Sequence, residues 1–191
     1  MRYIGLLLLV GVFFLSCSSV DFDHPLPADK MSQAQQKAFE GAWLLQDEDG
    51  EEGMVIHLEF ENAEQAQLAS VFRERGVFEM VKGEISFSLI GEQSYLNLRM
   101  QNSKGDWEKY LIFGYTLQGT KLNLRPLEVD TLKKLVEEKQ LKGKVEESSY
   151  RTQVEVVNSP EELRAVFSKK GVVSFSEEEP LVLKKLLGAG L

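Results

Sequence analysis

The sequence has little of the chemistry on which metal sites and many enzymes depend. Its 191 residues include one cysteine and two histidines. Zinc sites in proteins take three or four ligands, mostly Cys and His, and one cysteine cannot form a disulfide within the chain. We therefore expect no metal site, no cofactor and no stabilising disulfide.

The chain also lacks an excess of basic residues and the motifs of the common catalytic sites. Its 22 Lys and Arg residues face 30 Asp and Glu residues, which gives a net charge of −8. Nucleic-acid binding selects a basic face, so we expect no nucleic acid as a partner. No Gly-x-Ser-x-Gly elbow, phosphate-binding loop or dinucleotide fingerprint is present. The chain is therefore not expected to be an enzyme.

No apolar run in the sequence is as long as a bilayer-spanning helix, which needs about 20 residues. The longest runs from Ile4 to Leu15, after a basic start at Arg2, and ends in small residues around Cys17. A short positive start, a short apolar core and small closing residues are typical of a secretory signal peptide. We therefore predict that residues 1–16 are a signal peptide.

The closing segment Phe14-Leu15-Ser16-Cys17 resembles the lipobox of bacterial lipoproteins, although the lipobox prefers Leu where Phe14 stands. The resemblance implies cleavage before Cys17 and acylation of its sulfur, so acyl chains would bind the membrane. Ser18 and Ser19 follow instead of an inner-membrane retention Asp. The resemblance thus implies an outer-membrane lipoprotein that faces the periplasm.

Residues 17–38 are predicted to form the lipidated cysteine and a flexible tether, because Asp and Pro are frequent between residues 21 and 29. Within it, Ser32 and Gln35 match a capping box and favour a short helix over residues 32–38. A single β-rich globular domain is expected over residues 39–188.

Alternation of apolar and polar residues dominates between Phe39 and Leu127, as in Ile85-Ser86-Phe87-Ser88-Leu89. Turn residues such as Asp49-Gly50 and Gln118-Gly119 separate the runs, which is typical of antiparallel strands joined in a meander. The segment Ala63–Arg75 fits a helix or a strand, and its place inside the meander favours a strand.

Two helices are predicted after the meander, over residues 129–141 with Gly143 as a stop, and after the cap Ser159-Pro160-Glu161-Glu162. Strands are expected over residues 152–157, 172–175 and 181–187. The predicted fold is α+β and mainly β. It is an antiparallel meander that curls into a barrel or half-barrel, with two helices covering its open side.

Two further resemblances concern the domain. Gly41-Ala42-Trp43 resembles the Gly-x-Trp that starts the first strand of lipocalins, where the Trp closes one end of the barrel; the alternative is an ordinary core tryptophan. The layout of Lys109–Lys185, which includes the capped helix and a Pro-Leu-Val-Leu closing strand, resembles an uncharacterised family of proteobacterial envelope proteins. That resemblance implies an envelope location and no functional residue.

The candidate ligand-binding residues are the aromatic ones that we place inside the meander. They are Trp43, Trp107, Phe113 and Tyr115. Four polar residues on alternating positions either line a barrel interior or face solvent, and the cost of burying an unpaired Arg favours solvent. They are Asn97, Arg99, Asn123 and Arg125. His57 is expected to have a structural or surface role, because no nucleophile or second His accompanies it as a catalytic base or metal ligand would require. The acidic run Asp47–Glu52 is expected to be a solvated loop because it lacks EF-hand spacing.

Two functions fit these features. The first is a non-catalytic, lipid-anchored envelope protein that presents a surface to a protein partner. The second is a lipocalin-like carrier of a small apolar ligand held inside the meander, whereas small barrels are commonly filled by their own side chains.

Overall fold

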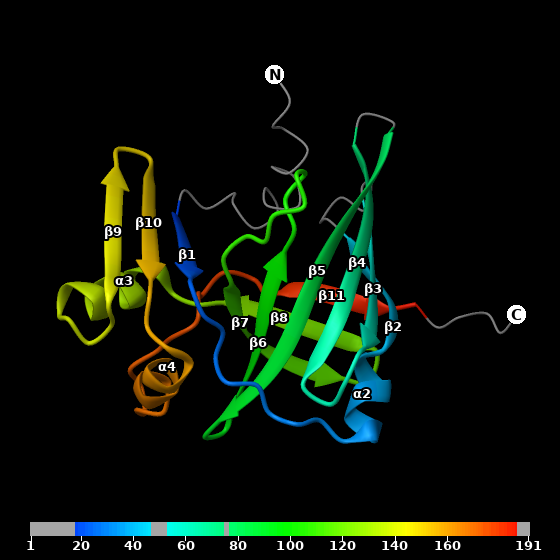
Figure 1. Ribbon diagram of the computed structural model, residues 1–191, viewed down its shortest axis with the longest axis horizontal. Helices are drawn as coiled ribbons and strands as arrows, with labels where there is room; N and C mark the ends of the chain where they lie inside the picture. Colours follow the sequence, from blue (N-terminus) through cyan, green and yellow to red (C-terminus); the bar gives the residue numbers. More distant parts are fainter. Residues whose placement is uncertain (1–17, 47–52, 75–76, 187–191) are drawn as a thin grey trace, which may run out of the picture.

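A computed structural model describes residues 18–46, 53–74 and 77–186, and in it eight antiparallel strands form a closed barrel (Figure 1). The order around the barrel is β11-β2-β3-β4-β5-β6-β7-β8, and β8 pairs with β11 to close it. The predicted mainly β barrel is confirmed. Its strands are β2 (Gly41–Gln46), β3 (Gly53–Phe60), β4 (Gln65–Glu74), β5 (Val77–Ile90), β6 (Gln93–Met100), β7 (Leu111–Gln118), β8 (Lys121–Pro126) and β11 (Leu181–Lys185).

The period-two pattern of the sequence decides which side chains fill the barrel. On β3, for example, Met54 and Leu58 are buried while Val55 and His57 are exposed. The ambiguous segment Ala63–Arg75 is a strand, β4, as its place in the meander favours. Among the described residues, this alternation produces one apolar core inside the barrel.

A second layer lies against the outside of the barrel and has its own core. It consists of a three-stranded sheet of order β1-β10-β9 and two helices. Outward side chains of the barrel strands, such as Tyr95 and Ile112, belong to this second core. Its elements are β1 (Ser18–Phe22), β9 (Gly143–Ser148), β10 (Arg151–Val156), α3 (Val129–Glu137) and α4 (Pro160–Phe167).

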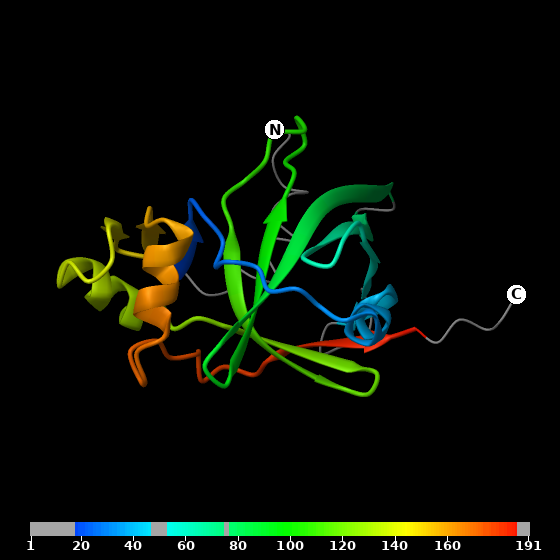
Figure 2. The same ribbon diagram turned by 60° about the horizontal axis from the view of Figure 1, so that its bottom comes forward.

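The predicted place of the two helices needs a correction. A closed barrel has no open side, so α3 and α4 pack on the second sheet and on the outer barrel face (Figure 2). The cap at Ser159 forms as expected, because its hydroxyl accepts from the Glu162 amide and the Glu162 side chain accepts from the Ser159 amide.

The prediction of a flexible tether is wrong for residues 18–38. β1 pairs in parallel with β10 from its first residue, and Phe22, Leu26 and Met31 are buried. The Asp- and Pro-rich composition that suggested flexibility belongs to an extended chain that crosses the outer barrel face. The short helix α2 (Gln33–Phe39) follows with its predicted capping box at Ser32 and Gln35.

Two further predictions fail for local reasons. The first helix ends at Glu137, and Gly143 starts β9, where an added Cβ would lie 2.0 Å from the carbonyl oxygen of Glu155. Gly143 is thus required by close strand approach, not by the helix end. Residues 172–175 form no strand, since their described pairing is a single bridge between Leu127 and Phe175.

Candidate functional site

The barrel interior is the first candidate site, and aromatic rings fill the half of it next to α2. Phe87 lies at the centre of this group, with ring centroids 4.5 Å from Phe39, 5.6 Å from Tyr115 and 5.9 Å from Phe60. Burial raises the pKa of the Tyr115 hydroxyl, and a hydrogen bond with Ser94 partly opposes this shift. This half of the interior is occupied by the chain's own side chains.

Helix α2 closes the same end of the barrel through Trp43 and Lys185. Trp43 is fully buried, and its Nε1 donates a hydrogen bond of 2.7 Å to the carbonyl of Phe39. The Lys185 ammonium lies 5.4 Å from the centroid of the Trp43 ring and donates to the carbonyls of Ala38 and Lys37, at 2.8 and 3.0 Å. A cation placed on the carbonyl end of a short helix complements its dipole.

The other half of the interior holds an apolar cavity of about 40 Å³. Ser70 is the single polar residue among those that line it. Pockets for small ligands usually have about 300–1,000 Å³, so this cavity is far too small for such a ligand in the present conformation. The cavity is lined by Leu45, Met54, Ile56, Leu58, Leu68, Ser70, Ile85, Leu96, Leu98, Met100, Leu122, Leu124, Leu181 and Leu183.

The four predicted ligand-binding aromatic residues do not all meet. Trp43, Phe113 and Tyr115 belong to the barrel core, as placed from the sequence. Trp107 lies outside it, before β7 begins, and bridges to Gln101 in the connection between β6 and β7. The sequence-based placement of Trp107 assumed that the alternation of β7 continues back to residue 107. It does not, because β7 begins at Leu111.

Trp107 instead forms part of a cluster around Arg99 on the outer barrel face. The Arg99 guanidinium lies 4.6 Å from the Trp107 ring centroid and 4.7 Å from that of Tyr110, and it bonds to Glu84 at 2.6 Å. Tyr110 also donates to Glu84, and burial raises the pKa of the Tyr110 hydroxyl while the charge of Arg99 opposes the shift. The Arg99 side chain, whose buried Nε has no hydrogen-bond partner among the described residues, thus contacts two aromatic rings and one carboxylate, and these contacts hold the β6–β7 connection on the barrel.

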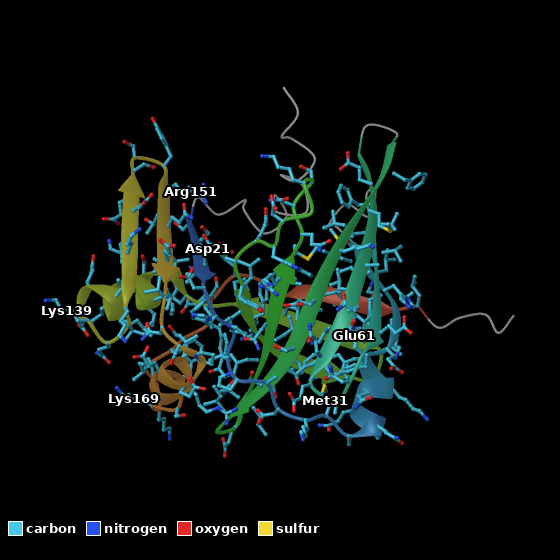
Figure 3. The ribbon with its side chains drawn as sticks, in the orientation of Figure 1. Asp21, Met31, Glu61, Lys139, Arg151 and Lys169 are labelled. Carbon is cyan, nitrogen blue, oxygen red and sulfur yellow. The ribbon has the colours of Figure 1, made fainter. Side chains whose placement is uncertain are left out.

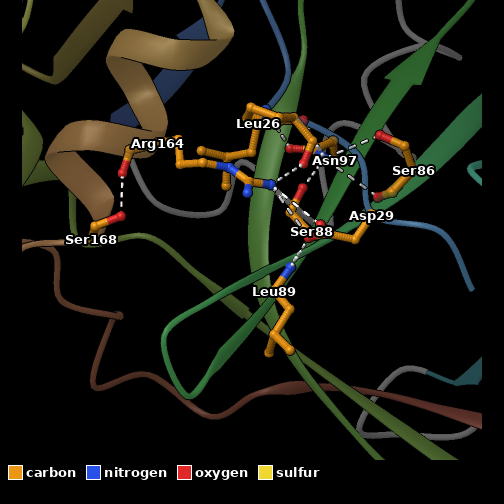
Figure 4. Close-up of polar contacts among 9 residues, drawn as sticks. Leu26, Asp29, Ser86, Ser88, Leu89, Asn97, Arg164 and Ser168 are labelled. Carbon is orange, nitrogen blue, oxygen red and sulfur yellow. Dashed lines mark hydrogen bonds and ion pairs between the residues drawn. The ribbon is translucent and has the colours of Figure 1, made fainter.

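Asn97 is the residue that departs most from the sequence-based expectation. It points outward from β6, as expected, but it is fully buried because residues 25–29 cover it (Figure 4). Its Oδ1 accepts from the Leu26 amide at 3.0 Å, and its Nδ2 donates to the Leu26 carbonyl and to the hydroxyls of Ser86 and Ser88. Two of the other residues expected to face solvent do so to different degrees. Arg125 is exposed, whereas Asn123 is partly exposed and its side chain donates a hydrogen bond to Thr116.

Two more contacts fasten the same segment to the molecule. The Asp29 carboxylate accepts from the Leu89 amide at 2.7 Å, and Arg164 of α4 donates to Asp29 and to the carbonyl of Pro27 (Figure 4). Residues 23–31 therefore join the barrel to the second layer.

An exposed apolar row on the outer barrel face is the second candidate site. Strand pairing places Leu44 next to Val55, Val55 next to Val71, and Val71 next to Met80. Val55, Val71 and Met80 are exposed, Met80 by 64%, and Leu44 is partly exposed. We call these four residues the outer row. The neighbouring row is more polar and includes Lys82 and His57, whose exposed position agrees with the structural or surface role predicted for it.

Sequence reasoning did not find the outer row because each of its members is a lone apolar residue at an outward position. The sequence does contain an indication of this row in Met54-Val55-Ile56, where three apolar residues in succession break the alternation. Val55, in the middle, therefore points away from the core. The register of the four strands β2 to β5 was needed to show that these outward apolar residues are neighbours.

Within the described residues, no group of three or more His, Cys, Asp or Glu side chains is placed to hold a metal ion. No helix in that part of the chain has the length and apolarity to cross a membrane. Cys17 and the acidic run Asp47–Glu52 lie outside the described residues. Comparison with family models, with curated proteins and with solved structures found no match for this chain.

Proposed function

We propose that this protein is a non-catalytic lipoprotein of the bacterial outer membrane, acylated at Cys17 and facing the periplasm, that binds an envelope protein through the outer row. The lipobox-like segment supports the anchor. The filled barrel supports a scaffold, since its cavity of about 40 Å³ leaves no room for a small ligand inside the barrel in this conformation.

The outer row is the observation that carries the protein-binding part of the proposal. It continues across four neighbouring strands, β2 to β5, and charged groups such as Lys82 and Lys184 border it. An exposed apolar patch with a polar rim is typical of protein interfaces. The partner is therefore expected to present an apolar patch of its own.

Photo-crosslinking in cells tests this assignment. A photoreactive residue at Val71 is expected to give one discrete adduct, which is lost when Met80→Glu is added. The matched control carries the same group at Arg125, which is exposed on β8. Equal adducts from both positions, or no adduct from Val71, would contradict the proposal, and an adduct of twice the chain's mass would indicate self-association instead.

A second candidate function is a lipocalin-like carrier of a small apolar ligand. The observation that favours it is the apolar cavity, whose lining includes the flexible side chains of Met54 and Met100. A ligand would have to expand the cavity several-fold, to about 300 Å³. The packed aromatic half and the small cavity favour the scaffold over the carrier.

A further inference from the structure

The end of the molecule at which β1 starts has features that the proposed anchor and the outer row do not explain. β1 begins at Ser18, which pairs with Thr152 of β10. Cys17 is bonded directly to Ser18, so their Cα atoms lie about 3.8 Å apart. An acyl group on Cys17 would therefore be attached at the edge of a folded sheet, with no flexible spacer between them.

The turn between β9 and β10 is next to this attachment point. Its residue Tyr150 is 83% exposed and lies two residues before Thr152. Arg151, the next residue in the chain, donates to the Ser19 hydroxyl and lies at the same end of the molecule as the start of β1 (Figure 3). A large exposed aromatic side chain thus lies two residues before the partner of Ser18, the residue that follows Cys17 in the chain.

The far side of the barrel presents further apolar side chains at the same end. β4 ends and β5 starts there, level with the β9–β10 turn and the β6–β7 connection (Figure 1). Phe78, the second residue of β5, is 73% exposed, and Trp107 in the β6–β7 connection is 40% exposed. Three separate loops or strand ends at this end of the molecule therefore carry an aromatic residue that is exposed to solvent.

We propose that this end lies flat on the bilayer and inserts Phe78 and Tyr150 into its interface, an inference that rests on the proposed acylation of Cys17. Aromatic side chains are enriched at membrane–water interfaces. The acyl chains would hold the protein to the membrane, and apolar contact would set its orientation, because the net charge of −8 gives no attraction to anionic lipid.

This orientation leaves the outer row free for a protein partner. Met80 is two residues from Phe78 along β5, which is about 7 Å at the usual rise of a strand, in the direction away from the end proposed to contact the bilayer. The outer row lies on the side of the barrel formed by β2 to β5, so this orientation would not place it against the bilayer. The opposite end, where β5 meets β6, would point away from the bilayer.

Site-specific fluorescence tests the orientation on the acylated full-length protein in vesicles of phosphatidylethanolamine and phosphatidylglycerol. Acylated Cys17 has no free thiol and the chain has no other cysteine, so an introduced cysteine is the single labelling site. Phe78→Cys and Tyr150→Cys each receive a polarity-sensitive dye. The matched control is Leu89→Cys, which is 56% exposed near the opposite end of the same strand β5.

We expect the dye at residues 78 and 150 to shift to the blue on reconstitution and to lose most of its emission when nitroxide-labelled lipid is included. The dye at residue 89 is expected to change little. If the dye shows the same emission shift and quenching at all three positions while the intact mass shows acyl chains, the proposed orientation is wrong, but the proposed acylation of Cys17 is supported. A blue shift without quenching by lipid means that protein covers the site, which also overturns the orientation. An intact mass without acyl chains refutes the proposed function itself.

Discussion

Replacing Asn97 with alanine is expected to lower the free energy of unfolding by about 3 kcal/mol. The substitution removes the groups that pair with both the amide and the carbonyl of Leu26, and both remain buried. Each unpaired buried backbone group costs about 1–3 kcal/mol. Hydrogen exchange is expected to show faster opening of residues 18–31 than of the barrel strands.

The matched control for this prediction is Asn123→Ala. Asn123 occupies the same place in a second Asn-Leu-Arg triplet, on β8, and its side chain donates a hydrogen bond of 3.2 Å to Thr116 near the surface. Its loss is expected to cost about 0.5 kcal/mol. Equal effects of the two substitutions in urea denaturation would show that Asn97 does not hold the N-terminal segment on the barrel.

Replacing Trp43 with alanine is expected to cost about 3–5 kcal/mol, the usual range for a large aromatic residue in a core. Trp43 is fully buried, and its bond to the Phe39 carbonyl holds α2 over the end of the barrel. We expect α2 to lose part of its protection from hydrogen exchange in this variant, because the hydrogen bond that joins the Phe39 carbonyl to Trp43 of β2 is gone.

Trp107→Ala serves as the control, since the chain has two tryptophans. Trp107 is partly exposed and contributes mainly its contact with Arg99, so its loss is expected to cost about 1 kcal/mol or less. If denaturation curves showed the two variants equally destabilised, the view of the barrel as a packed scaffold closed by Trp43 would be wrong.

Alternation was sufficient to predict the antiparallel meander, but it left a barrel and a half-barrel equally open. The pairing of β11 with β8 and β2, which closes the barrel, joins residues far apart in the sequence. The meander strands have neighbours in sequence as their partners, so the local pattern and the turns specify them together. β1 and β9 escaped prediction because they are short and polar, and the partner of Ser18 lies at Thr152, far along the chain.

The candidate sites show the same limit. The outward position of Asn97 on its strand was inferred correctly. Alternation does not indicate which segment covers the outer face of the barrel, and residues 25–29 cover it at Asn97. The same limit applies to the outer row, whose members are neighbours through strand register alone. Composition misled at residues 18–38, where frequent Asp and Pro suggested a free tether.

Mass spectrometry of the full-length protein extracted from membranes tests the central claim most directly, first under native and then under denaturing conditions. We predict a chain that starts at Cys17, carries acyl chains that survive denaturation, and loses no further mass when it unfolds. A bound lipid released on unfolding would favour the carrier over the scaffold. An unmodified cysteine, or a chain that retains residues 1–16, would contradict the account of a lipid-anchored barrel.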